Sequence, residues 1–275
     1  MKIVLSFLCS FFVVLAHNSL AQEVTTEAQQ YSFWELKNDS FNYGEQSILE
    51  LWAYQNGYGN NDLSDIYKLR FYQPLSIHQW KGMMRIDTAI SSTWGPNAPG
   101  QSSGQFSAGN TMLTIWGMPP GFLPTWNLNL GGRIIFPFGN NGQWAVGPQV
   151  SASFVPQISS KFLLSDFSPL VRYMYGFDSK NNSFAINPSQ PPLLRTLQLF
   201  PTVGLQLSRS TQIRFWDENG ILYNSAGGGW FVPLDAMVTH SINKHLLFAV
   251  GASKAVVQTF QSYDWSIYGK ISIRF

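Results

Sequence analysis

Apolar and polar residues alternate along most of the chain after about residue 47. In the C-terminal segment one set of alternate positions is almost wholly apolar: Trp265, Ile267, Gly269, Ile271, Ile273 and Phe275. The positions between them are mostly polar or charged: Ser266, Tyr268, Lys270, Ser272 and Arg274. A period of two predicts a β-strand with one apolar and one polar face. The same pattern recurs in segments that begin near Met84, Trp126, Trp144 and Leu197.

Turn signals rich in glycine, asparagine and proline separate these segments, for example Asn56-Gly57, Pro119-Pro120-Gly121 and Glu218-Asn219-Gly220. We predict about twelve strands, near residues 47–54, 64–75, 81–92, 108–117, 125–137, 143–156, 163–176, 193–208, 211–223, 228–240, 245–258 and 264–275. An even number of strands, each of about 9–11 residues or more, is typical of an outer-membrane β-barrel. The expected fold class is all-β, a transmembrane antiparallel β-barrel over residues 47–275.

A soluble β-sandwich is the alternative, because alternation alone does not say which face meets solvent. Charged residues make up 12% of the chain, about half of the ~25% usual in soluble domains. The chain also ends on an aromatic residue, Phe275, and places aromatic residues near strand ends where a membrane-interface girdle would lie: Trp126, Trp144, Tyr173, Tyr175, Trp230 and Trp265. These features favour a barrel in the bacterial outer membrane, delivered to the barrel assembly machinery through Phe275.

The N-terminus has the features of a secretory signal peptide over residues 1–21. Lys2 precedes an apolar run from Ile3 to Ala16, and Ser19-Leu20-Ala21 forms a small-x-small cleavage site before Gln22. Cleavage leaves 254 of the 275 residues and removes Cys9, so disulfides and thiolate chemistry are excluded from the mature chain. Residues 22–46 are expected to form either a loose periplasmic segment or a plug inside the lumen.

The chemistry of the remaining residues predicts neither an enzyme nor a nucleic-acid-binding protein. The net charge is +2 over the whole chain, too small for a general basic field that would attract nucleic acid. His78, His240 and His245 lie near predicted turns and have no nucleophile or metal-ligand motif beside them. We therefore expect no catalytic, cofactor-binding or metal-binding residues.

Charged residues on the polar faces are the candidate functional residues. A charge that faces lipid at the middle of the membrane costs about 2–4 kcal/mol, so these side chains are expected to line the lumen. The predicted lumen-lining residues are Arg85, Asp87, Arg133, Arg172, Asp235 and Lys270; Arg274 is expected near the periplasmic rim. Either they pair into a network that plugs a narrow barrel, with Asp87 and Asp235 bracing the arginines, or they line a path and set its selectivity.

Prolines and glycines recur in the predicted strands. Prolines remove hydrogen-bond donors from the ladder, at Pro137, Pro148 and Pro233. Glycines allow bulges or close backbone approach, at Gly131, Gly132, Gly147 and Gly227–Gly229. They are expected either to shape the wall or to form a lateral opening in it.

Four blocks of the sequence resemble a known family. They are the stretch 65–88 with Tyr72-Gln73-Pro74, the stretch Gly131–Pro137 with the following Gly142–Pro148, the stretch Gly228–Leu234, and Trp265–Phe275. Together they resemble the bacterial outer-membrane proteins of the MetA phenol-degradation family, which are similar in build to FadL-type hydrophobic-compound transporters. Asp235 departs from the pattern, since glycine is expected there.

The resemblance implies a barrel that passes or binds a small hydrophobic or aromatic compound. Its expected partners are outer-membrane lipid, the assembly machinery and that small molecule. The alternatives are a membrane-embedded, lipid-modifying enzyme and a structural or adhesive barrel without transport.

Overall fold

The computed structural model describes residues 46–59, 61–95, 106–118, 126–139, 143–154, 164–179, 194–208, 210–259 and 262–275. The predicted signal peptide and nearly all of the segment 22–46 therefore lie outside the described residues. None of the described residues belongs to a helix that could cross a membrane.

The described residues form strands joined in one 14-stranded sheet. The strands are β1 (Ile48–Gly57), β2 (Leu63–Ile77), β3 (Trp80–Trp94), β4 (Ser107–Ala108), β5 (Thr111–Met118), β6 (Trp126–Phe136), β7 (Gln143–Phe154), β8 (Leu164–Ser179), β9 (Arg195–Gln206), β10 (Thr211–Phe215), β11 (Ile221–Asn224), β12 (Trp230–Ser241), β13 (Leu246–Gln258) and β14 (Trp265–Arg274). All pairings are antiparallel, and most join neighbours in chain order. The exceptions are the two-residue β4, which lies beside β3, and β10 and β11, which pair with β9 and β12 but not with each other.

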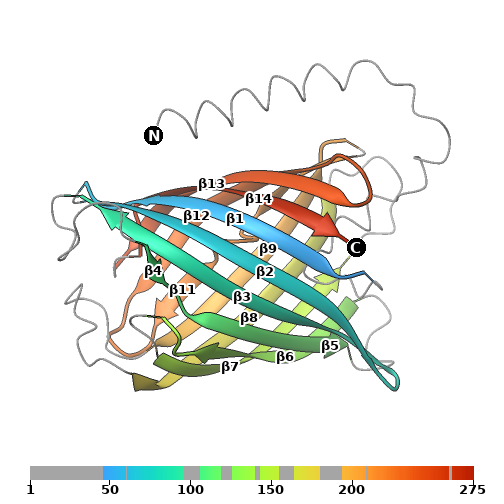
Figure 1. Cartoon of the computed structure of the whole chain (residues 1–275), viewed down its shortest axis with the longest axis horizontal. Coiled ribbons are helices and arrows are strands. Elements are labelled where there is room, and N and C mark those ends of the chain that lie inside the picture. The colour runs from blue at the N-terminus through green and yellow to red at the C-terminus, as the bar shows by residue number, and fades with distance from the viewer. Residues whose placement is uncertain are drawn as a thin grey trace.

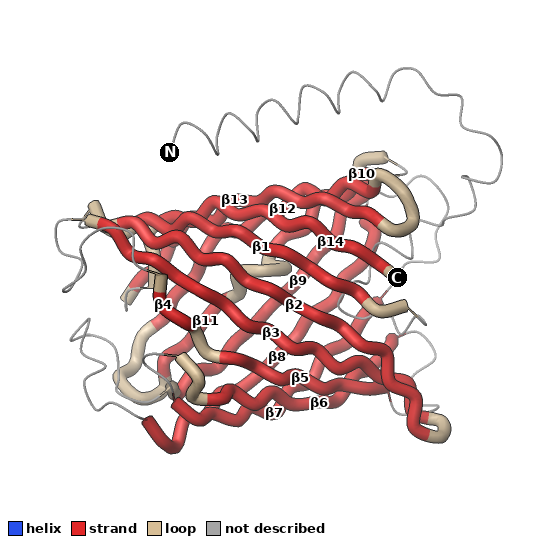
Figure 2. Tube along the Cα trace, viewed as in Figure 1, coloured by secondary structure: helices blue, strands red, loops and turns tan. Residues whose placement is uncertain are grey.

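The sheet closes into a barrel because the first and last strands pair along their whole length. Ile48 lies opposite Arg274, and Gly57 lies opposite Trp265. The strands run obliquely around the barrel axis, and the start of β1 lies at the same end as the C-terminus (Figures 1 and 2). Closure leaves no unpaired edge, which is the condition for a sheet to span a membrane.

One wall position is shared by two short strands, so the barrel has 12 strand positions. Both β10 and β11 pair with β9 on one side and with β12 on the other. Residues 216–220 separate them and leave the ladder, and Trp216 has a positive φ of 50°. The predicted strand 211–223 is therefore correct at its two ends and wrong at its centre.

Prolines and glycines on β5, β6 and β7 do not open the wall. The pairing of β6 with β7 continues through Gly131, Gly132 and Gly147, with Pro148 opposite Gly132. Pro233 lies at a register shift between β12 and β13, as expected for a residue that cannot donate to the ladder. Toward β8 the pairs Val146–Tyr175 and Gln149–Arg172 flank Gly147 and Pro148 in one register, so these residues shape the wall and do not shift its strands.

Candidate functional site

The two faces of the barrel wall differ sharply in polarity. The outer face exposes large apolar side chains on strands all round the barrel, among them Leu51, Leu69, Ile86, Ile115, Leu130, Val150, Val171, Leu234, Ile267 and Ile271. The inner face buries polar and charged side chains, among them Glu50, Arg70, Asp87, Thr114, Gln149, Arg172, Gln212, Arg214, Asp235 and Lys270. This arrangement is the reverse of a soluble sandwich and is that of a membrane barrel, which confirms the predicted fold class.

The structure places all six predicted lumen-lining residues on the inner face. On β3, Arg85 and Asp87 alternate with the exposed Ile86. On β6, Arg133 is followed by the exposed Ile134, and on β8 the buried Arg172 is preceded by the exposed Val171. Buried side chains at the two remaining positions, Asp235 on β12 and Lys270 on β14, also point inward. Their contacts divide them into three groups.

The first group is a network of ion pairs on β1, β2, β3 and β14. Asp87 accepts hydrogen bonds from Arg70 Nε at 2.7 Å and from Arg85 Nε at 2.8 Å. Glu50 accepts one from Lys270 Nζ at 2.7 Å. Both carboxylates have no solvent-exposed side-chain area, so this part of the lumen is braced rather than open.

Glu218, in the segment between β10 and β11, extends this network across the lumen. Its carboxylate accepts hydrogen bonds from Arg70 Nη1 at 2.8 Å and Nη2 at 2.7 Å, and from Lys68 Nζ at 3.2 Å. Tyr54 Oη donates a further bond of 2.5 Å. Since β2 lies five wall positions from β10 and β11 in the strand order, Glu218 joins nearly opposite walls. We call residues 216–220 the inward segment and these contacts the Glu218 strut.

Asp235 belongs to a second group and does not brace an arginine. Its carboxylate accepts hydrogen bonds from Asn219 Nδ2 at 2.9 Å and from Tyr268 Oη at 2.7 Å. The expectation that Asp235 neutralises the predicted arginines is therefore wrong. Asp235 is buried on the inner face, but β12 lies five wall positions from β6 and three from β8 in the strand order. Asp235 instead holds the inward segment through Asn219.

The third group is Arg133 and Arg172, which bond to neutral side chains. Arg133 Nε donates to Thr114 Oγ1 at 2.9 Å. Arg172 Nε donates to Gln198 Oε1 at 2.8 Å, and its Nη1 lies 3.3 Å from Gln149 Oε1. These two arginines lie on the wall formed by β5 to β9.

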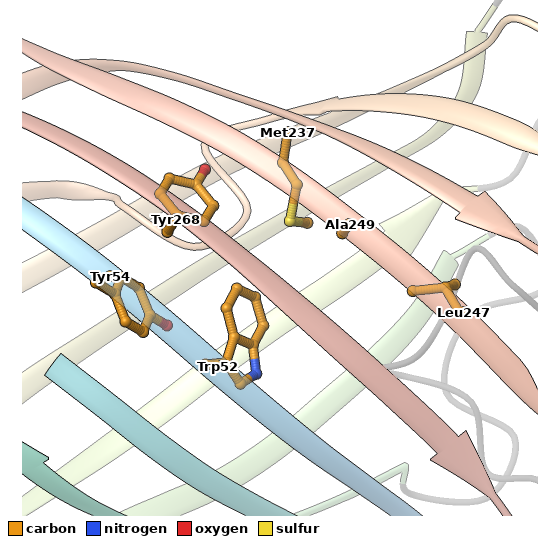
Figure 3. Close-up of a cluster of buried hydrophobic side chains, with 6 residues drawn as sticks. All are labelled: Trp52, Tyr54, Met237, Leu247, Ala249 and Tyr268. Atoms are coloured by element: carbon orange, nitrogen blue, oxygen red, sulfur yellow. The ribbon is translucent and has the colours of Figure 1, made fainter. Parts of the chain in front are cut away.

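Aromatic rings cover the lumen side of β1 and β14. Trp52 and Tyr54 stack with their centroids 5.7 Å apart, and Tyr268 lies 5.7 Å from Tyr54. Met237, Leu247 and Ala249 complete this buried cluster (Figure 3). The guanidinium of Arg70 lies 4.5 Å from the Trp52 ring centroid, so the rings also contact the ion-pair network.

A further polar cluster lies where β8, β9 and β10 meet. Asp166 accepts hydrogen bonds from Ser168 at 2.8 Å and from Gln212 at 3.1 Å, and Arg214 lies 3.4 Å away. Gly204 faces this cluster, and a Cβ there would lie 2.2 Å from Asp166 Oδ1. Glycine is therefore required at this position by a close approach.

Several residues of the lumen network were not singled out from the sequence: Glu50, Lys68, Arg70, Asp166, Arg214 and Glu218. Alternation within the predicted strands would have placed Glu50, Lys68 and Arg70 on the inner face, beside Tyr72. Glu218 carried no such signal, since Glu218-Asn219-Gly220 has the composition of a turn.

His240 and His245 contact groups that would not form a catalytic triad. His240 Nδ1 lies 2.9 Å from Thr211 Oγ1, and His245 Nδ1 lies 3.0 Å from the backbone oxygen of Arg274. Within the described part of the chain, no group of three His, Cys, Asp or Glu side chains could hold a metal ion.

Solved structures that resemble this barrel have different functions. The NanC porin has 10% identity and a TM-score of 0.49, covering 82% of this chain and 98% of that one. The KdgM porin in complex with disordered oligogalacturonate has 10% identity and a TM-score of 0.42, with the same coverage. Outer membrane phospholipase A from Escherichia coli has 10% identity and a TM-score of 0.37, covering 84% of this chain and 90% of that one. The likeness concerns the fold alone.

No protein-family model and no curated protein matches the chain. The resemblance to the MetA phenol-degradation family and to FadL-type transporters therefore stays a prediction. The barrel itself is independent of that resemblance: a closed antiparallel sheet with an even number of strands, an apolar exterior and a polar interior is the architecture of bacterial outer-membrane proteins. The chain has the fold of an outer-membrane β-barrel, in agreement with its predicted location.

Proposed function

We propose that this protein is a channel that carries small solutes across the outer membrane. One observation supports the proposal above all: the inner face is lined by charged and hydrogen-bonding side chains around the whole barrel, while the outer face is apolar. Burying charges is costly unless each is paired, and Arg133 and Arg172 bond only to neutral acceptors, which a structural or adhesive role alone does not account for. Charged linings of this kind set the selectivity of channels.

The Glu218 strut makes the proposed channel narrow at its middle. Side chains, and not a wall strand, span the lumen there, and they come from a segment outside the ladder. Such a segment changes position without breaking the barrel, since β10 and β11 keep their own pairings with β9 and β12. The proposal therefore includes passage that depends on the position of the inward segment.

A hydrophobic or aromatic solute is the more specific candidate that the family resemblance implies. The aromatic cluster of Trp52, Tyr54 and Tyr268 supports it, because stacked rings on the lumen side would favour an aromatic solute. An embedded lipid-modifying enzyme has less support, since His240 contacts a threonine side chain and His245 contacts a backbone oxygen.

The proposal is tested with the protein isolated from outer membranes and reconstituted into planar lipid bilayers and into liposomes. We expect discrete conductance steps, and entry of small solutes into the liposomes with an upper size limit. Phenol and a neutral sugar of similar size, compared in the same liposomes, test the aromatic candidate. Intact, folded barrel that gives neither conductance nor solute entry would contradict the channel proposal, and release of fatty acid from the liposome lipid would favour the enzyme.

A further inference from the structure

On the wall formed by β5 to β9, Arg133 and Arg172 have no ion-pair partner among the side chains that the structure describes. Arg133 donates one hydrogen bond, from Nε to Thr114 Oγ1. Its terminal nitrogens, Nη1 and Nη2, have no hydrogen-bond or ion-pair partner among the described residues. Four N–H donors of this guanidinium therefore face the lumen, since arginine has five donors and no acceptor.

Arg172 has the same character two wall positions away. It is 5% exposed, and its bonds go to the amide oxygens of Gln198 and Gln149. These amides fix the plane of the guanidinium but bring no negative charge. Among the described residues Arg172 makes no ion pair, so its positive charge is also uncompensated.

The carboxylates of the lumen are engaged elsewhere. Asp87 is shared by Arg70 and Arg85, and Glu50 is bonded by Lys270. Asp166 is the one acidic side chain that the structure describes between residues 107 and 206, and it pairs with Arg214 at the other side of β9. A buried guanidinium without a partner is unfavourable, and no described side chain supplies one here, so these donors are available to water or to a solute anion.

Register places the two arginines on either side of β7. Arg133 lies opposite Gly147, and Arg172 lies opposite Gln149, which is two residues further along the same strand. The strand between them, β7, has no charged residue and so adds no charge to the wall. Trp116 on β5 lies opposite Gly131 on β6, two residues from Arg133. The Trp116 side chain is 5% exposed, and its Nε1 has no hydrogen-bond partner among the described residues. A third donor without an acceptor thus belongs to the same region.

We propose that Arg133 and Arg172 form a binding site for the carboxylate group of a small organic anion. The proposal rests on the proposed channel function and names the class of solute that the channel prefers. Arginine matches a carboxylate with two parallel N–H···O bonds, and a solute bound in this way replaces the missing acidic side chains. Uncompensated arginines in a pore also favour anions over cations during passage.

The test compares benzoate with phenol, which share a ring and differ in the carboxylate. Binding to the detergent-solubilised barrel is measured by titration calorimetry, and ion selectivity is measured in bilayers from the reversal potential in a salt gradient. We expect benzoate to bind and phenol to bind much more weakly. Replacement of either arginine, Arg133→Gln or Arg172→Gln, is expected to weaken benzoate binding about tenfold and to shift the reversal potential toward cations.

Lys254→Gln is the matched control, because Lys254 is an exposed cation near the end of β13 and outside the lumen. Equal binding of benzoate to the wild type and to both arginine variants would overturn the site. Equal binding of sulfate and benzoate, lost together in the variants, would overturn the carboxylate preference in favour of a general anion site. A barrel that binds benzoate but carries no current would refute the channel and leave the site standing, so the two proposals fail separately.

Discussion

Replacing Glu218 by glutamine is expected to raise the single-channel conductance several-fold. The glutamine side chain has the same length, but it removes the negative charge that holds Arg70 and Lys68 across the lumen. Those two cations then repel each other, and the inward segment loses its strongest contact with the opposite wall. We expect a loss of about 1–3 kcal/mol in the free energy of unfolding, since hydrogen bonds to charged groups are removed. Bilayer recordings and urea unfolding of the same preparation measure both effects.

Asp217→Asn is the control for this experiment, because it removes the same charge from the neighbouring residue. Asp217 pairs with Arg214 on the adjoining strand β10, at 3.1 Å, and does not reach across the lumen. Its conductance is expected to stay close to that of the wild type. If Glu218→Gln lowers stability but leaves conductance unchanged, the strut is a structural brace and does not limit passage. If both variants conduct alike, the effect comes from charge in the segment and not from the strut.

Most of the wall could be predicted from alternation alone. A period of two fixes which side chains share a face, and the low charge of the apolar face decides that this face meets lipid. Arg85, Asp87, Arg133 and Lys270 were assigned to the lumen on this basis, and the structure places them there. Strand ends follow the turn signals less closely: Asn56-Gly57 lies within β1, and the predicted strand 211–223 is divided into β10 and β11.

Contacts across the lumen could not be predicted in this way. Alternation gives the face of a residue but not its place around the circumference. One alternative therefore had Asp235 bracing arginines that lie three to five wall positions from it, whereas its partners are Asn219 and Tyr268. The contacts of the inward segment could not be predicted from alternation either. Glu218-Asn219-Gly220 has the composition of a turn, and the strands on both sides continue the alternation. The strand pairings of the structure show that β10 and β11 occupy one wall position. The structure also shows that Glu218 contacts Arg70, which is 148 residues away in sequence.

The lumen charges thus have two different roles. On β1, β2, β3 and β14 acidic and basic side chains are matched, and their mutual hydrogen bonds stabilise the barrel interior. On β6 and β8 basic side chains are matched only by neutral acceptors. Of the two alternatives drawn from the sequence, a bracing network describes the first wall, and a selective path along the second wall is what we propose.

Placing arginine at Ile271 is expected to destabilise the barrel by about 2–4 kcal/mol, because the side chain would face hydrocarbon near the middle of the membrane. Ile271 is 38% exposed on the outer face of β14, opposite Leu51, which is 51% exposed.

Val256→Arg is the matched control. Val256 is 59% exposed near the end of β13, two residues from the native Lys254, and a charge near the interface costs only about 0–1 kcal/mol. Urea unfolding of both variants in liposomes measures the difference. Equal losses would mean that the outer face does not meet lipid at Ile271, and a smaller loss at Ile271 than at Val256 would place the membrane midplane elsewhere along the barrel axis.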